Sequence, residues 1–342
     1  MKRAALGVLV IVTAAACVSR PVAPAIPAIP TAGVTLPSHI RVQFVEQGAT
    51  VVRDVPLEDY VQATAISEVA PAAGELQTVE RMLEGQTIIS RTYAVAHLGR
   101  HAREGFDLCA TTHCQLFEPR RLQTSRWAAA SSQAVTRTAG LVLLFDRQPA
   151  QALFHADCGG YTSTSSAVWG GADRAYLVAR PDEGVPPDAH ARWQYEVSLP
   201  ALAAALNEAR VDAQTTVHGR VDAIEIASRD AAGRVEHIVI RSRGRAATAG
   251  VTTTVMRGDA FRRALGRAFG PRAIRSTHFD IRRTGGTLTF AGRGFGHGVG
   301  LCQAGALARL HAGATPADVI RYYYPGVVLG PGLGAWDRGS GV

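Results

Sequence analysis

One long helical pattern constrains the fold of this chain more than any other feature. Apolar residues recur at three-to-four spacing through residues 78–101, among them Val79, Met82 and Ile89. This spacing places them on one face of a helix, so the helix must bury that face against a core. Gly85 lies inside the run and costs helix stability, about 1 kcal/mol relative to alanine, unless a neighbouring group packs closely there.

The rest of the chain mixes short strands with helices. Alternating apolar and polar residues, or short apolar runs, predict strands at residues 40–45, 50–53, 141–145, 152–155, 221–226 and 235–240. Helical spacing and start and stop signals predict helices from Pro56 toward Glu68 and at residues 127–138, 199–209, 258–265, 303–311 and 316–324. The last of these has a capping box, Thr315 with Asp318, and a proline at its first position. Because no regular βαβ alternation is present, we expect an α+β fold with mixed sheets and packed helices.

The first sixteen residues predict a secretory signal. Lys2 and Arg3 precede an apolar run at residues 4–16, which is too short for a membrane span of about 20 residues. Cys17 follows small residues directly and is predicted to be lipidated, which would anchor an exported chain in the periplasm or cell envelope. Ala14 stands where such sites usually have leucine, so simple signal cleavage is the alternative. The proline-rich residues 17–38 predict an extended tether.

Length and composition allow a sizeable core. The chain has 342 residues, of which 47% are hydrophobic and 19% charged, enough for one large domain or two small ones. We place one domain at residues 39–335, with a possible subdomain at 193–283, and a tail at 336–342. The net charge of +8 suits an anionic envelope surface. Aromatic residues make up only 6% and no lysine-rich run occurs, so nucleic-acid binding is not expected.

A compact group of thiols and imidazoles is a candidate metal site. Cys109, His113 and Cys114 lie within six residues, and His101 is the nearest candidate for a fourth ligand. Structural zinc takes four such ligands. A Cys109–Cys114 disulfide is the alternative in an oxidising compartment, and two reduced buried thiols are a third reading.

A second group of residues is split between two distant segments. His155 precedes Cys158, and His297 precedes Cys302 and Gln303. A Cys158–Cys302 disulfide, simple proximity, or a second metal site with the two histidines would each explain the pattern. A lone histidine in a glycine loop is more often a hydrogen-bonding residue than a ligand, so we favour the disulfide or proximity.

Glycine occupies every second position from Gly292 to Gly300. This alternation does not match the dinucleotide-binding fingerprint. It clears the side chains from one face of an extended chain, so that another group can come close. The group is either a sugar ring, contacted by His297 and Gln303, or another stretch of the protein's own backbone.

Glu68 is the candidate catalytic acid. Its apolar neighbours Ile66 and Val69 would exclude water and raise the pKa of its carboxyl toward the range useful for proton transfer. On residue type alone, an ordinary exposed glutamate at a helix end is the commoner case.

Three stretches together resemble the SpoIID/LytB family. The first runs from Ser67-Glu68-Val69 to Cys114-Gln115 and contains Gln86-Thr-Ile-Ile-Ser-Arg-Thr-Tyr-Ala94. The second is Phe154-His-Ala-Asp-Cys-Gly-Gly-Tyr-Thr162. The third contains Gly-His-Gly-Val-Gly-Leu-Cys-Gln-Ala-Gly, ending at Gly305, and is the most specific. The resemblance extends over residues 40–330.

The resemblance implies a lytic transglycosylase that cleaves peptidoglycan glycan strands already stripped of their stem peptides. Glu68 falls where the family carries its catalytic glutamate. The cluster of His101, Cys109, His113 and Cys114 would hold structural zinc. The remaining expected contacts line a glycan groove, namely Arg91, Tyr93, Gln115, His155, His297 and Gln303. An N-acetylmuramoyl-L-alanine amidase is the expected partner, and a non-catalytic amidase enhancer is the alternative function.

Two departures from the family pattern affect these expectations. The spacer between Glu68 and the helix containing Arg91 is longer than usual. Glu84 stands where a lysine commonly precedes the alanine-glutamine pair of that helix, which makes Glu84 a rival carboxylate.

Overall fold

The computed structural model describes residues 34–69, 75–186, 189–208, 217, 219–244 and 250–332. The predicted signal segment, the lipidation site Cys17, the tether up to residue 33 and the tail at 336–342 lie outside these residues. Export and lipid anchoring therefore remain predictions. No helix within the described ranges is both long and apolar enough to cross a membrane.

Helices and small sheets alternate irregularly along the described chain, which confirms the α+β prediction. The helices are α1 Leu57–Glu68, α2 Leu76–Ala96, α3 Arg121–Thr124, α4 Ala128–Arg137, α5 Ser165–Trp169, α6 Leu199–Glu208, α7 Gly258–Phe269, α8 Gln303–His311 and α9 Pro316–Tyr323, with a 3-10 turn η1 at Ala102–Glu104. The strands are β1 His39–Glu46, β2 Ala49–Pro56, β3 Leu108–Cys109, β4 Leu141–Phe145, β5 Gln148–Pro149, β6 Phe154–His155, β7 Arg192–Ser198, β8 Arg220–Arg229, β9 Val235–Arg243, β10 Val251–Arg257, β11 Phe279–Thr284, β12 Thr287–Arg293, β13 Leu301–Cys302 and β14 Val328–Pro331.

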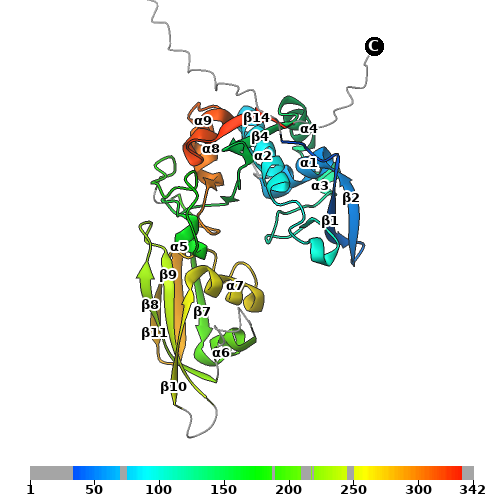
Figure 1. Cartoon of the computed structure of the whole chain (residues 1–342). Coiled ribbons are helices and arrows are strands. Elements are labelled where there is room, and N and C mark those ends of the chain that lie inside the picture. The colour runs from blue at the N-terminus through cyan, green and yellow to red at the C-terminus, as the bar shows by residue number, and fades with distance from the viewer. Residues whose placement is uncertain are drawn as a thin grey trace, which may run out of the picture.

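Two lobes make up the molecule (Figure 1). The first is built from both ends of the described chain, with α1 and α2 at its centre, and α4, α8 and α9 packed on α2. β1 and β2 form an antiparallel hairpin, to which β3 adds in parallel. The hairpin turns at Gln47-Gly48, where both residues have positive φ, as a two-residue turn of this hand requires.

The long helix α2 is shorter than the predicted span 78–101. It ends at Ala96, because His97 leaves helical geometry and Gly99 adopts a left-handed conformation with φ of 72°. The predicted buried face lies in the core, since Val79, Met82 and Ile89 are each at most 3% exposed. At Gly85 a Cβ atom would lie 3.9 Å from Pro316, the first residue of α9, so the two helices meet there at ordinary van der Waals distance.

The second lobe has a hydrophobic core of its own. Two three-stranded sheets, in the orders β10-β9-β8 and β11-β12-β7, pack with α6 and α7 around residues such as Phe261, Phe279 and Phe290. The lobe runs from β7 to β12, and the possible subdomain at 193–283 falls within it. The described chain returns to the first lobe through the glycine-rich segment and α8 (Figure 1).

Polar contacts, one of them fully buried, join the two lobes. Arg234, at the start of β9, is 1% exposed and donates to the carbonyl oxygen of Cys158 in the first lobe. Trp169 on α5 donates its indole N–H to Asp259 on α7 at 2.9 Å. Arg257 donates to the carbonyl oxygens of Ser166 and Ala167, at 3.3 Å each.

Candidate functional site

Glu68 is the last residue of α1, where the helix meets the loop that follows the cysteine cluster. Its Oε1 atom accepts a hydrogen bond from the Leu116 amide at 2.6 Å. The neighbouring Ser67 hydroxyl accepts a hydrogen bond from the Glu118 amide at 3.1 Å. Two consecutive residues of α1 are therefore joined to the same loop, and this fixes where the carboxyl group lies.

The surroundings of Glu68 favour its protonated form. Burial raises the pKa of its carboxyl from 4.5 to about 7, and the Leu116 hydrogen bond opposes this only in part. Among the described residues, no cationic side chain forms an ion pair with Glu68. A carboxyl group with a pKa near neutrality can both donate and accept a proton at physiological pH, as general acid–base catalysis requires.

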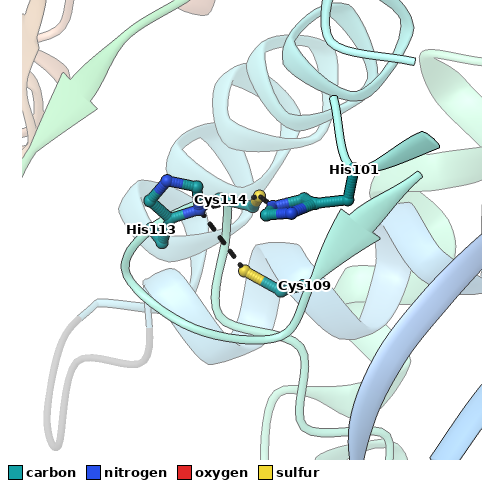
Figure 2. A group of neighbouring side chains, drawn as sticks. All are labelled: His101, Cys109, His113 and Cys114. Atoms are coloured by element: carbon teal, nitrogen blue, oxygen red, sulfur yellow. Dashed lines mark hydrogen bonds between the residues drawn. The ribbon is translucent and has the colours of Figure 1, made fainter. Parts of the chain in front are cut away.

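The four residues of the predicted cluster converge in space (Figure 2). The ligand atoms of His101, Cys109, His113 and Cys114 all lie within 4.8 Å of one another. His101 Nε2 is 3.4 Å from Cys114 Sγ, and His113 Nδ1 is 3.7 Å from each sulfur. A tetrahedral zinc ion with arms of about 2.0 to 2.3 Å separates its ligand atoms by roughly 3.5 Å, so the donor atoms fit that ion.

The chemistry of the donor set also suits zinc. The Cys114 thiol hydrogen-bonds to Cys109 and lowers the pKa of Cys109 to about 4, while the same hydrogen bond raises the pKa of Cys114. The two sulfurs thus share one proton, which a divalent cation would displace. Glu104 accepts a hydrogen bond from His101 Nδ1 at 2.6 Å, which leaves Nε2 directed at the sulfurs. The role of Glu104 was not predicted from the sequence. Its position three residues after His101 is the local signal that could have indicated this hydrogen bond.

The cluster and Glu68 belong to one structural unit. Only Gln115 separates Cys114 from Leu116, whose amide holds Glu68. Gln115 was expected to contact the glycan, and this prediction is wrong for the described structure. Its side chain is 0% exposed and accepts a hydrogen bond from the Tyr60 hydroxyl at 3.1 Å, because it anchors the loop to α1.

Arg91 was also expected in a groove, and the structure contradicts this. Its guanidinium is fully buried and donates to both oxygens of Glu58, at 2.7 and 2.6 Å, and to the Leu141 carbonyl at 3.1 Å. α1 and β4, which contain Glu58 and Leu141, both contact α2. A charge there must be paired, and the bidentate bond to Glu58 supplies the partner.

Tyr93 lies near Glu68 but is only 5% exposed, so it does not form an open wall. It stacks on His97 with ring centroids 4.0 Å apart, and its hydroxyl accepts a hydrogen bond from Arg100 at 3.1 Å. Burial raises the pKa of Tyr93, and the neighbouring Cys114, Cys109 and Glu68 add to the increase.

His155 and His297 do come together, with ring centroids 5.5 Å apart. His155 is 4% exposed and donates from Nδ1 to the Val299 carbonyl at 3.2 Å, so the expectation that it faces a groove is wrong. His297 is partly exposed and packs against Trp169 at 5.1 Å. Burial lowers the pKa of both imidazoles, that of His297 to about 4, so both are neutral at pH 7.

The alternating glycines contact the protein itself and do not form a bare surface. Four of the five have φ between 70° and 107°, so the segment is not the extended chain that was expected. A Cβ atom at Gly300 would lie 2.1 Å from the Leu153 carbonyl oxygen, and one at Gly296 would lie 2.7 Å from His155 Cβ. The glycines of this segment therefore accommodate backbone and side chains of the protein itself.

Gln303 begins α8 and is partly exposed. It donates to the side chain of Gln86 on α2 at 3.3 Å, which links the glycine-rich segment to the helix that packs beside α1. Glu84, the rival carboxylate, forms an ion pair with Arg137 at 2.6 Å. Because its carboxylate is already engaged by Arg137, Glu84 is the weaker candidate for a catalytic group.

Cys109, Cys114, Cys158 and Cys302 are free thiols in the structure, and all four are buried. Neither of the disulfides considered from the sequence is formed. Cys158, Cys302 and His155 have their ligand atoms within 4.8 Å of one another. Among the described residues, no hydrogen bond or ring contact joins this second group directly to Glu68 or to the first cluster.

Comparison with known proteins gives two matching family models. Residues 45–145 match SpoIID, described as stage II sporulation protein, and residues 186–300 match a domain of unknown function, DUF8618. Glu68 and the four residues of the first cluster fall within the SpoIID match, and the DUF8618 match covers the second lobe from β7 to β12.

Curated relatives extend the similarity over most of the chain. Stage II sporulation protein D of Bacillus amyloliquefaciens is 28% identical over 290 residues, which cover 81% of this chain and 74% of that protein. Stage II sporulation protein D of Bacillus subtilis is 25% identical over 289 residues, covering 81% and 75%. The amidase enhancer of Bacillus subtilis is 25% identical over 295 residues, which cover 76% of this chain but only 39% of that protein.

Proposed function

We propose that this chain is a member of the SpoIID family, to which residues 45–145 and the sporulation and enhancer relatives are similar, and that it is a lytic transglycosylase that cleaves the glycan strands of peptidoglycan. Glu68 is the proposed catalytic residue. The observation that carries the proposal is the environment of this carboxyl group. It is mostly buried, it has no cationic partner among the described residues, and its pKa is raised to about 7.

The proposed reaction needs one carboxyl group and no water. The protonated Glu68 donates its proton to the glycosidic oxygen, and the bond from that oxygen to C1 of the N-acetylmuramic acid breaks. The resulting carboxylate then accepts the proton of the sugar's own 6-hydroxyl, whose oxygen attacks C1. The products are a new free hydroxyl on one strand and a 1,6-anhydromuramic acid end on the other, and Glu68 is protonated again.

The geometry at Glu68 supports the two roles. The Leu116 amide holds Oε1, so the carboxyl group keeps one orientation, while Oε2 has no hydrogen-bond partner among the described residues. Preorganisation of this kind lowers the cost of reaching a reactive arrangement. Of the expected glycan contacts, the two partly exposed side chains, His297 and Gln303, remain candidates.

We further propose that the four-residue cluster binds structural zinc. His101, Cys109, His113 and Cys114 would be the ligands, and the ion would fix the loop whose Leu116 amide orients Glu68. Zinc in this place would contribute folding free energy.

The proposed setting is the cell envelope. The signal segment and Cys17 predict export to the periplasm or envelope and a lipid anchor. Glycan free of stem peptides is the proposed substrate, and an N-acetylmuramoyl-L-alanine amidase would supply it.

Digestion of denuded glycan strands tests the enzymatic proposal. The wild-type protein should release fragments with 1,6-anhydromuramic acid ends, recognised in mass spectra because each lacks one water relative to a hydrolysis product. Glu68→Gln should abolish these fragments, with a loss of at least about 100-fold, since proton transfer contributes that much or more. The matched control Glu84→Gln should keep its activity, because the Glu84 carboxylate is paired with Arg137.

A second function is favoured by the similarity to the amidase enhancer. In that case, wild-type protein and both variants would bind glycan, leave the strands intact and stimulate an added amidase to the same degree. Intact strands with wild-type protein would therefore exclude the transglycosylase and support the enhancer. Loss of activity in Glu84→Gln but not in Glu68→Gln would exclude the assignment of Glu68.

A further inference from the structure

A pair of buried thiols has no role in the proposed reaction. Cys158 follows β6, and Cys302 ends β13 and caps the N-terminus of α8, where its sulfur accepts a hydrogen bond from the Gly305 amide at 3.4 Å. Both side chains are 0% exposed and belong to the same hydrophobic core. The two sulfur atoms lie within 4.8 Å of each other, although 144 residues separate them along the chain.

The backbone holds the two cysteines in bonding reach. β6 and β13 pair in parallel, with Cys302 opposite His155. Hydrogen bonds of 3.0 Å flank Cys302 on both sides, from Leu301 to Leu153 and from Ala304 to Ala156. The Cys158 amide donates to Cys302 Sγ at 3.2 Å. The sulfurs already lie within 4.8 Å of each other, and the bond requires them to approach to about 2 Å.

We propose that Cys158 and Cys302 form a disulfide in the mature protein. The bond fastens the loop after β6 to the start of α8. This junction matters to both lobes, because the Cys158 carbonyl accepts the buried Arg234 of the second lobe and the next residue after Cys302 is Gln303. The inference does not depend on Glu68 or on the proposed reaction.

The oxidation requires a disulfide as electron acceptor, either a small molecule such as oxidised glutathione or an envelope thiol oxidoreductase. One cysteine, as its thiolate, attacks the acceptor, which forms a mixed disulfide and releases one thiol. The second thiolate then attacks the sulfur of the first cysteine, which forms the internal bond and releases the second thiol. The two cysteines lose two electrons and two protons, and the acceptor gains both.

Burial determines when the bond can form. It raises the pKa of Cys302, and the neighbouring Cys158 adds to the increase. Because the thiolate is the reacting species, the folded and reduced protein should oxidise slowly. The bond therefore forms while the chain folds and is afterwards shielded from reductants by the same core.

A metal ion is the competing occupant of this place. His155, Cys158 and Cys302 supply three ligands, but structural zinc takes four. The nearby Asp182 carboxylate already accepts hydrogen bonds from Tyr323 at 2.6 Å and Arg309 at 3.2 Å. These contacts and the buried guanidinium of Arg234 disfavour a divalent cation.

Peptide mapping tests the proposal directly. Wild-type protein is refolded in a glutathione redox buffer with zinc, unfolded without reductant, alkylated, and digested. We expect a linked peptide pair containing Cys158 and Cys302, which separates on reduction. Alkylated Cys158 and Cys302 in this sample would overturn the proposal, and so would an equivalent of zinc that is lost in Cys302→Ala. The state of Cys109 and Cys114 in the same digest reports separately on the first cluster.

Denaturation of the oxidised and the reduced protein provides a second test. A disulfide that closes a loop of this length should lower the unfolding equilibrium constant on the order of 1,000-fold. Reduction of wild-type protein should remove that protection, whereas reduction should not change the stability of the double variant Cys158→Ala/Cys302→Ala. Equal denaturation midpoints for oxidised and reduced wild-type protein would contradict the proposal. If the double variant fails to fold, the comparison of oxidised and reduced wild type still decides the question.

Discussion

Glu68 differs from Glu58 and Glu84, also in the first lobe, in the groups that contact its carboxyl group. Glu58 is held by Arg91, and Glu84 by Arg137, each through a short ion pair. Glu68 has a single amide donor, and burial is the largest influence on its pKa. Among these three glutamates, Glu68 is therefore the one that combines burial with the absence of an arginine partner.

The raised pKa of Glu68 predicts how stability depends on pH. The folded state holds the proton more tightly than the unfolded chain, whose glutamate has a pKa near 4.5. This contribution to stability is therefore fully present below about pH 4 and is lost as the pH rises through about 7. The Glu68→Gln variant has no carboxyl group to lose this contribution. Its free energy of unfolding relative to that of wild type should therefore rise by up to about 3 kcal/mol between pH 4 and pH 9.

Urea denaturation of both proteins across this range measures the difference. Parallel curves for wild type and Glu68→Gln would show that Glu68 titrates as an ordinary exposed carboxyl group. A wild type that loses stability as the pH falls would reverse the sign and indicate that Glu68 is held as a carboxylate.

The sequence did not predict the positions of residues whose hydrogen-bond partners lie far away along the chain. Arg91 was expected in a glycan groove, but the C-terminal half of its helix is buried all round. The three-to-four pattern did not reveal Glu58, which lies 33 residues earlier and turns the supposed outer face of α2 into a buried contact. Gln115 is a similar case, since Tyr60 lies 55 residues away. The grouping of His101 with Cys109, His113 and Cys114 was visible because all four lie within 14 residues.

At the scale of the elements, local signals predicted the boundaries of the last two helices well. The predicted helix at 303–311 coincides with α8, and the capping box of Thr315 and Asp318 is present at the start of α9. The strands β3, β6 and β13 have two residues each and exist only because a distant backbone segment pairs with them, so no local pattern marks their extent. The glycine-rich segment shows the same limit, because the groups that its glycines accommodate come from elsewhere in the chain.

The loop from Cys109 to Leu116 leads to a prediction about metal removal. Protein purified without added zinc should carry one zinc ion per chain in elemental analysis, and His101→Ala should lose most of it. Removal of the ion should free the loop and speed hydrogen exchange at the Leu116 amide, because that amide is held beside the cluster. The exposed imidazole of His311 offers a control, so His311→Ala should retain the ion. Zinc-free wild-type protein with a protected Leu116 amide would contradict the proposal.

At the scale of the whole molecule, the two lobes have separate hydrophobic cores. A small group of polar contacts, called the seam below, joins them. The second lobe has its own aromatic core, so it does not need the first lobe to bury its apolar residues. The contacts across the seam include hydrogen bonds from Arg234, Trp169 and Arg257, and one from the Ser163 hydroxyl to Asp230. Such a seam fixes relative position without sharing a core, and the buried guanidinium is its most desolvated member.

This arrangement predicts that Arg234→Met separates the unfolding of the two lobes. The variant leaves the Cys158 carbonyl without its charged donor and removes the contact with Thr277, which should cost about 2 kcal/mol. Scanning calorimetry should show one cooperative transition for wild type and two for the variant, because each lobe then unfolds around its own core. The control is Arg241→Met on the same strand, whose ion pair with Glu225 is half-exposed and should contribute at most about 1 kcal/mol. A single transition for Arg234→Met, displaced no further than that of Arg241→Met, would show that the lobes are joined by something other than this buried arginine.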